Sequence, residues 1–165
     1  INYGLRVELT EINVHEGVTD IPFGAIVACL ACSSVVLPST LVSIRNHAFS
    51  NCSSLKTINF PDSVTHIGDW AFDRCSSLSS VHLPDALTTL ESAAFRGSSS
   101  LLAIDLPNSL RSIERFVFDS CSSLHTVNLP DNLTSIGIHA FAFCTSLSSI
   151  RIPDSAVVDK YALCG

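Results

Sequence analysis

Several residue types and patterns that mark common protein classes are scarce in this chain of 165 residues. It has no methionine, one tryptophan and two tyrosines, and only 15% of its residues are charged. No run of about 18 apolar residues occurs, so we expect no transmembrane segment in this chain. The formal net charge is −6 and the nine lysines and arginines are scattered. This argues against a nucleic-acid partner, because nucleic-acid-binding proteins gather basic residues on one face.

The motifs of common catalytic and phosphate-binding sites are missing as well. The seven glycines are dispersed and form no phosphate-binding loop, and neither an HExxH nor a GxSxG motif is present. A nucleophile needs a positioned base, and nothing in the sequence supplies one. We therefore expect no enzymatic activity and no cofactor.

The sequence does contain a repeat with a fixed period of 23 residues. Six prolines keep this period, at Pro38, Pro61, Pro84, Pro107, Pro130 and Pro153. Five phenylalanines keep it too, at Phe49, Phe72, Phe95, Phe118 and Phe141. A period of this length indicates a solenoid, in which one repeat cannot bury its apolar side alone and stacked repeats can.

Each repeat carries the same apolar positions, which we expect to face inward. In one repeat they are Leu55, Ile58, Phe60, Val64, Ile67, Ala71, Phe72 and Cys75. The alternation around Ile58 predicts a half-buried strand, which Pro61 ends because proline has no N–H for a ladder. The pair Val64 and Ile67 predicts a second short extended segment, and residues 68–74 are long enough for one helical turn. The Phe column is expected to be the backbone of the core.

Residues 1–165 are interpreted as a single solenoid domain with atypical ends. Residues 9–31 form a degenerate first rung, residues 32–153 form regular repeats, and residues 154–165 form an irregular end. After Pro153 the register slips by one residue. Two explanations are open, a terminal cap or a cut from a longer solenoid, and we favour the second.

One copy of the pattern consists of Leu124, Val127, Leu129, Pro130, Leu133, Ile136, Ala140, Phe141 and Cys144. Over about residues 9–153 the pattern resembles the BspA-like, or Treponema-type, leucine-rich repeat. The better-known leucine-rich repeat places Asn or Cys three residues after the third apolar strand position. That position is held here by Ser63, Ala86, Ser109, Asn132 or Ser155. The chain is therefore not of the ribonuclease-inhibitor type.

The resemblance implies a curved solenoid with a stacked parallel β-sheet on its concave side. Short strands, turns and single helical turns are implied on the convex side. It also implies adhesion or protein binding at a cell surface, by a family that has no catalytic residues. Repeat arrays also serve inside cells, so a structural or accessory subunit of an intracellular assembly is the alternative. Two sequons, at Asn51 and Asn132, would carry glycans only in a secreted protein.

The seven cysteines are interpreted as mostly structural. Five of them share one position of the repeat, which Ser98 fills in a further copy: Cys29, Cys52, Cys75, Cys121 and Cys144. A position that accepts serine needs a small hydrogen-bond donor, so we expect buried free thiols bonded to loop carbonyls. Cys29-x-x-Cys32 has the spacing of a redox or zinc half-site, but no second pair follows and Cys32 occupies the position of Leu55. Cys164 lies outside this column.

Metal sites are not expected either. Four aspartates follow the prolines, at Asp62, Asp85, Asp131 and Asp154. Such a ladder offers the oxygen ligands that Ca²⁺ prefers, but each Asp sits alone in its turn, so turn formation is the preferred interpretation. The six histidines are spread over several positions of the repeat.

The expected partner is another protein, and the outward strand positions are one candidate surface. Most of their side chains are small and polar, whereas interface centres favour Trp, Tyr and Arg. The candidate contacts on this face are His82, His125 and Arg151. Solenoids usually bind through such a sheet face.

The flank of the repeat is the second candidate surface. Trp70, Phe116 and His139 share the position just before the Ala-Phe pair, and Phe143 lies beside it. The repeat demands neither Trp70 nor Phe116. If these rings are exposed they form an apolar patch of the kind that marks interaction sites. The alternative is that they pack against neighbouring turns.

Overall fold

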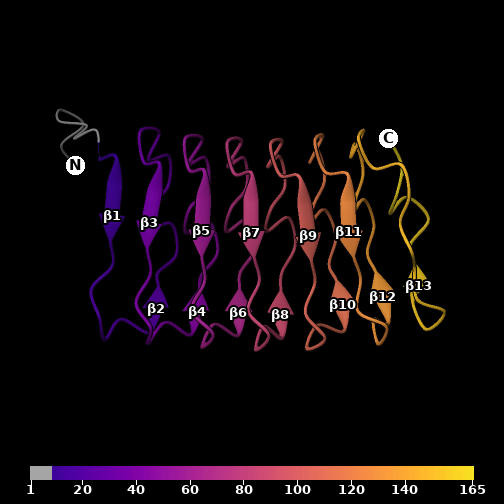
Figure 1. Ribbon diagram of the computed structural model, residues 1–165, viewed down its shortest axis with the longest axis horizontal. Coiled ribbons are helices and arrows are strands. Elements are labelled where there is room, and N and C mark those ends of the chain that lie inside the picture. Colours follow the sequence, from indigo (N-terminus) through magenta and orange to yellow (C-terminus); the bar gives the residue numbers. More distant parts are fainter. Residues whose placement is uncertain (1–8) are drawn as a thin grey trace.

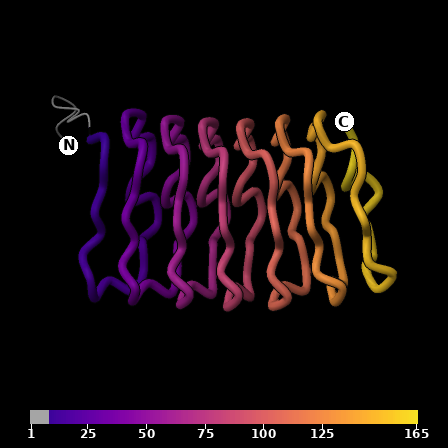
Figure 2. Tube along the Cα trace, viewed as in Figure 1, coloured from indigo at the N-terminus to yellow at the C-terminus, as the bar shows by residue number. Residues whose placement is uncertain are grey.

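The computed structural model describes residues 9–165, which form a row of similar rungs (Figure 1). Each rung is one turn of the chain, and successive turns lie side by side along the row (Figure 2). Three-residue strands occupy one position in the rungs: β1 (Glu11–Asn13), β3 (Ser34–Val36), β5 (Thr57–Asn59), β7 (Ser80–His82), β9 (Ala103–Asp105) and β11 (Thr126–Asn128). Two-residue strands occupy a second position: β2 (Asp20–Ile21), β4 (Ser43–Ile44), β6 (His66–Ile67), β8 (Thr89–Leu90), β10 (Ser112–Ile113), β12 (Ser135–Ile136) and β13 (Val157–Val158). The described residues contain no helix.

Parallel strand pairs join neighbouring rungs at the predicted spacing. Ile58 of β5 is paired with Val81 of β7, and both side chains are buried while the residues on either side are exposed. The predicted half-buried strand is therefore confirmed. The short strands form two ladders, β2-β4-β6-β8 and β10-β12-β13. There the later rung donates to the earlier one, as the N–H of Gly68 does to the carbonyl of Ile44 at 2.8 Å.

The phenylalanine column forms the centre of the core, as predicted. Its rings stack with centroids 5.1 to 5.9 Å apart: Phe49, Phe72, Phe95, Phe118 and Phe141. Phe60 meets Phe72 edge-on at 5.6 Å. Parallel strands lie about 4.7–4.9 Å apart, so equivalent rings of successive rungs fall at the separations that aromatic pairs prefer, about 4.5–7 Å.

The single helical turn predicted over residues 68–74 is not confirmed, since the structure has consecutive tight turns there. We call this part of each rung, between the short strand and the next long strand, the turn side. One set of N–H groups bonds three residues back, as Ala71 does to the carbonyl of Gly68 at 3.3 Å. The N–H groups that alternate with them donate to the following rung, as Phe72 does to the carbonyl of Ala94 at 2.7 Å. A helix would keep these donors within one rung, so the bonds between rungs oppose it.

Two positions on the turn side of each rung have a left-handed backbone. The first position holds Gly24, His47, Trp70, Ala93, Phe116 and His139. The second position holds Ala28, Asn51, Arg74, Gly97, Ser120 and Phe143. This conformation costs a residue with a Cβ about 1–2 kcal/mol. The same residues, with Trp70 and Ser120 as examples, donate their N–H groups to the following rung, which offsets part of that cost.

The last rung is one residue shorter than the others. Ile113 of β10 is paired with Ile136 of β12, one full repeat later in the chain. Ile136 is in turn paired with Val158 of β13, which comes one residue before a full repeat. The turn before β13 keeps its bond from the N–H of Ala156 to the carbonyl of Pro153, at 3.0 Å. The missing residue therefore falls between Ala156 and Val157.

The stacked rings predict a large effect of truncation inside the column. Phe95 is completely buried between two other rings, so Phe95→Ala should lower the free energy of unfolding by about 3–5 kcal/mol. Phe143→Ala is the matched control, because Phe143 is 58% exposed, and it should change stability by about 0.5 kcal/mol or less. Urea unfolding of both variants measures the difference, and equal losses would contradict the importance of the column.

The left-handed positions predict a stabilising substitution. Ser120 has a φ of 60° and its side chain makes no hydrogen bond among the described residues. Ser120→Gly should therefore stabilise the fold by about 0.5–1 kcal/mol, the relief of the left-handed strain less the chain entropy that glycine adds. Ser123→Gly is the control, since its backbone is not left-handed and it should lose stability. If thermal melting ranks the two variants in the opposite order, the left-handed backbone of Ser120 is not strained.

Candidate partner-binding surfaces

The structure places the seven predicted partner-binding residues on two separate surfaces. His82 lies on β7 and His125 lies beside β11. Arg151 holds the position of Asn128 one rung further on. All three are among the outward strand positions, which we call the strand face. The other four lie on the turn side: Trp70, Phe116, His139 and Phe143. The two groups come from different parts of each rung, so they do not form one site.

The strand face is exposed and mostly polar. His82 has the register position of Asp105 and Asn128, and the amide of Asn128 donates to the carboxylate of Asp105 at 2.5 Å. The Nδ1 of His125 lies 2.9 Å from the hydroxyl of Thr126, so this ring bonds within its own strand. Chemically, this face offers separate hydrogen-bonding groups without a buried centre.

The flank rings of the turn side pack on one another across the rungs. His47 stacks on Trp70 with ring centroids 6.1 Å apart, and Phe23 meets the edge of His47 at 5.6 Å. Farther along, Phe116 stacks on His139 at 5.3 Å. Most of these rings are half-buried. We call this set the aromatic flank: Phe23, His47, Trp70, Phe116, His139, Phe143 and Tyr161.

Sequence reasoning missed three members of the aromatic flank, namely Phe23, His47 and Tyr161, although His47 shares the column of His139. Tyr161 stacks on His139 with centroids 5.7 Å apart. It escaped notice because the short last rung shifts it by one position from the column of His139. Phe23 was missed because Gly24 holds the column position in the first rung. Following the one-residue slip after Pro153 through to the end of the chain would have located Tyr161.

Arg96 fills the break that Ala93 leaves in the aromatic flank. Its guanidinium lies 5.1 Å from the centre of the Trp70 ring. Its Nε lies 3.2 Å from Asp119, and another guanidinium nitrogen lies 3.9 Å from Asp73. Asp73, Arg96 and Asp119 hold the same position in three successive rungs, and this alternation of charge was the overlooked sequence signal.

The two aspartates beside Arg96 are both buried. Burial raises the pKa of Asp73, and the nearby cations Arg96 and Arg74 oppose that rise without cancelling it. One carboxylate oxygen of Asp73 is buried without a hydrogen bond among the described residues. The net environment of Asp73 therefore disfavours its charged form.

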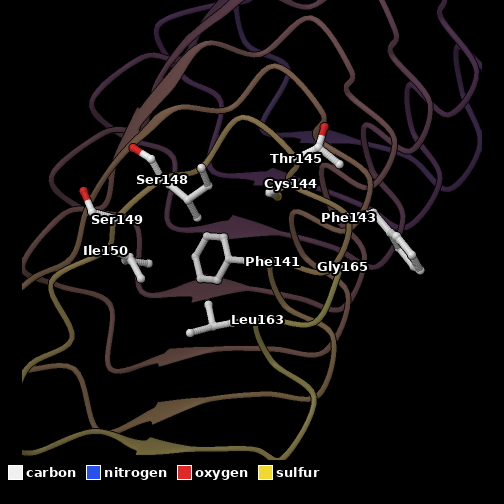
Figure 3. Close-up of a pocket in the computed structure, with 10 residues that line it drawn as sticks. Phe141, Phe143, Cys144, Thr145, Ser148, Ser149, Ile150, Leu163 and Gly165 are labelled. Carbon is white, nitrogen blue, oxygen red and sulfur yellow. The ribbon is translucent and has the colours of Figure 1, made fainter.

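A cavity of about 270 Å³ lies at the C-terminal end of the row (Figure 3). Phe141 and Leu163 point into it, whereas Phe143 points away. Phe141 is the last ring of the core column, so this cavity is where the stack of apolar layers stops. Its lining combines apolar side chains with polar groups, and Ser148 and Ser149 lie at one side.

The cysteine column consists of thiols that bond to carbonyl oxygens of the preceding rung. Cys75 donates to the carbonyl of Phe49 at 3.2 Å and Cys144 donates to that of Phe118 at 3.1 Å. Ser98 donates to the carbonyl of Phe72 at 3.4 Å, so serine replaces cysteine with the same bond. Burial raises the pKa of Cys144 to about 12, which keeps this thiol protonated. The predicted buried thiols are present at Cys52, Cys75, Cys121 and Cys144, whereas Cys29 is only half-buried, and every cysteine is free.

Residues 9–165 contain no candidate metal-binding cluster and no candidate membrane-spanning helix. Within that range, no group of three His, Cys, Asp or Glu residues is arranged to hold a metal ion. Within the same range, no helix has the length and apolar character needed to cross a bilayer.

Comparison with known families decides between repeat types. The profile of the BspA-type leucine-rich repeat region, in six copies, matches residues 5–100 and 42–165. This chain belongs to the BspA-type leucine-rich repeat family. The resemblance in the repeat pattern is thereby confirmed, and the parallel solenoid with rungs of 23 residues agrees with it. Comparison with curated protein sequences gave no match.

Solved structures of bacterial leucine-rich repeat proteins are similar to this BspA-type chain. A Treponema pallidum protein is 24% identical with a TM-score of 0.73, over 85% of this chain and 78% of that one. A Bacteroides ovatus protein is 31% identical with a TM-score of 0.72, over 91% of this chain and 45% of that one. A leucine-rich cell surface protein of Faecalibacterium prausnitzii is 25% identical with a TM-score of 0.59, over 95% of this chain and 51% of that one. The chain thus spans about half the length of the last two.

The environment of Asp73 in this BspA-type stack predicts how stability depends on pH. Folding raises the pKa of this carboxyl, so the folded state binds more protons than the unfolded state does. The folded protein therefore loses stability as pH rises from the ordinary Asp range through the raised pKa. Asp73→Asn should therefore raise the melting temperature at pH 7, with a gain that shrinks below the ordinary Asp range. Asp119→Asn is the matched control and should lower it, because Arg96 then loses its closer partner. The pH profile of melting decides, and destabilisation by Asp73→Asn at pH 7 would contradict the buried-charge argument.

Proposed function

We propose that this chain is a non-enzymatic protein-binding module that contacts its partner through the aromatic flank. One observation carries the proposal. Bulky rings such as Trp70 and Phe116 occupy left-handed positions that Gly24 and Ala93 fill in other rungs. The stack does not need a ring there, and the backbone conformation disfavours one. The needs of the repeat therefore do not explain why rings occupy these positions.

The aromatic flank is better suited to a protein partner than the strand face is. Aromatic residues and arginine are enriched at the energetic centres of interfaces, and the flank holds both. All of its rings except Phe143 are held in place by contacts with other rings, so little side-chain entropy is lost when a partner docks on their edges. Phe143 and Tyr161 extend the exposed apolar surface at the C-terminal end of the flank. Arg96 is bound to Asp119 within the flank, so it offers a pre-ordered cation.

Adhesion at a cell surface is the more specific role that we propose for this module. It is supported by membership of the BspA-type family and by the similarity to a leucine-rich cell surface protein. An accessory subunit of an intracellular assembly is the alternative, and the seven free cysteines favour it, because free thiols persist in reducing compartments.

The two sequons add a way to separate these roles. The amide of Asn132 donates to the carbonyl of Asn108 at 2.9 Å, and that of Asn51 donates to the hydroxyl of Ser50 at 3.0 Å. Glycans found on Asn51 or Asn132 in the native protein would favour the cell-surface role.

The double variant Trp70→Ala with Phe116→Ser tests the aromatic flank. Native pulldown from the source organism, quantified by mass spectrometry, should retain at least about tenfold less of the specific companion protein, since loss of hot-spot rings costs about 2 kcal/mol or more. Ala93 shows that the position accepts a small residue, so the stack should remain folded. Circular dichroism confirms folding before each pulldown.

A strand-face variant is the matched control. His82→Ser with Arg151→Ser also removes two large exposed side chains, and it should leave companion recovery unchanged. If the flank variant is folded and retains its companion while the strand-face variant loses it, the partner binds the strand face and the proposal is wrong.

A further inference from the structure

One turn in the first rung differs chemically from the equivalent turn in every later rung. In the later rungs a small residue, Cys or Ser, is followed three positions on by leucine: Cys52 and Leu55, Cys75 and Leu78, Ser98 and Leu101, Cys121 and Leu124, Cys144 and Leu147. In the first rung, between β2 and β3 (Figure 1), the same two positions hold Cys29 and Cys32. The rung thus carries two thiols across a single turn.

The geometry of this turn is set by the repeat. The N–H of Cys32 donates to the carbonyl of Cys29 at 3.2 Å, and the equivalent bond from Leu55 to Cys52 measures 3.1 Å. A four-residue turn brings its end Cα atoms within about 7 Å, and disulfides usually span about 4.4–6.8 Å between Cα atoms. The backbone therefore holds both thiols where a bond between them can form.

The two thiols differ in access. Cys29 is partly exposed, whereas Cys32 has no exposed surface and takes the place of a core leucine. The Cys29 thiol donates to the carbonyl of Leu9 over a long 3.7 Å, and the Cys32 thiol donates to that of Ser34 at 3.3 Å. An accessible thiol with a weak bond thus lies beside a sheltered one.

We propose that Cys29 and Cys32 form a dithiol–disulfide site that exchanges with low-molecular-weight disulfides. The Cys29 thiolate attacks one sulfur of the disulfide, which forms a mixed disulfide and releases one thiolate of the reagent. The Cys32 thiolate then attacks the Cys29 sulfur, which closes the Cys29–Cys32 bond and releases the second thiolate. The two released thiolates take up the two protons that Cys29 and Cys32 lose, so the protein is oxidised by two electrons and the reagent is reduced by two.

The closing step should depend on pH. Burial raises the pKa of Cys32, and the neighbouring Cys29 raises it further. The thiolate is the attacking species, so below that pKa the fraction of reactive Cys32 grows about tenfold per pH unit. The rate of closure should grow with it between pH 7 and 8.5, while the turn itself is unchanged.

The competing bond would join Cys29 to Cys52, its neighbour in the cysteine column. Cys52 is almost completely buried, and its thiol donates to the carbonyl of Ile26 at 3.0 Å. Burial also raises the pKa of Cys52 to about 11, which holds it as an unreactive thiol. These features favour closure within the turn over closure between rungs.

The experiment is peptide mapping after equilibration of the whole chain with oxidised and reduced glutathione. Free thiols are alkylated, and trypsin cuts at Arg6, Arg45 and Lys56. Cys29 and Cys32 then share the peptide of residues 7–45, whereas Cys52 lies in the peptide of residues 46–56. The expected result is a peptide 7–45 without alkyl groups and lighter by two hydrogen atoms, with the other five cysteines alkylated.

The chain itself supplies the control variants. Cys32→Leu restores the residue of the later rungs, and Cys29→Ser copies Ser98, so both should fold as the wild type does. In Cys32→Leu, glutathione should remain on Cys29 as a mixed disulfide. In Cys29→Ser no disulfide should form at Cys32, and Cys52→Ser should leave closure unchanged.

Three outcomes would overturn the proposal. All seven cysteines of the folded chain could remain alkylatable in the oxidising buffer. Peptides 7–45 and 46–56 could be joined by a bond to Cys52. In folded Cys32→Leu, Cys29 could also be found in a disulfide with another cysteine of the chain instead of with glutathione. Melting curves of each variant show that the tested protein is folded.

Discussion

The parallel hydrogen bonding between rungs is the constraint on which the rest of this structure depends. On the strand sides and on the turn side alike, backbone groups of one rung are satisfied by the next. This fixes equivalent atoms of successive rungs at one short spacing. This spacing stacks equivalent rings such as Phe72 and Phe95. It also places the thiol of Cys75 within hydrogen-bonding distance of the carbonyl of Phe49. Packing follows backbone pairing here, instead of directing it.

The parts of this arrangement that repeat could be predicted from the sequence. Three features recur with the period of the sequence: the strand at Ile58, the Phe column and the carbonyl-bonded thiols. For each of them a physical reason predicts a single structure. The turn side could not, because the left-handed conformation at Trp70 arises from bonds to another rung and tryptophan does not favour it. The stacking partner Tyr161 was not predicted, because the last rung is one residue shorter and a search at a fixed period misses the shifted position.

The same division separates the residues that build the stack from those available for recognition. Core positions accept few substitutions, since neighbours on both sides pack against them. On the turn side the first left-handed position accepts glycine, alanine, histidine, tryptophan and phenylalanine without a change in backbone conformation. A surface that varies while its scaffold stays fixed is what a binding module requires, and it is the physical basis for placing the partner on the aromatic flank. The strand face shares this freedom but uses it for small polar groups.

The direction of the hydrogen bonds between rungs has an electrostatic consequence. On the turn side the N–H groups donate to the following rung, as Phe72 does to Ala94, while on the short-strand side they donate to the preceding rung, as Gly68 does to Ile44. The peptide dipoles on these two sides therefore oppose each other along the axis of the row. An α-helix adds its dipoles into a macrodipole with charged ends. In this stack the two sets offset each other, so each further rung adds less net dipole than the same number of aligned peptides in a helix would.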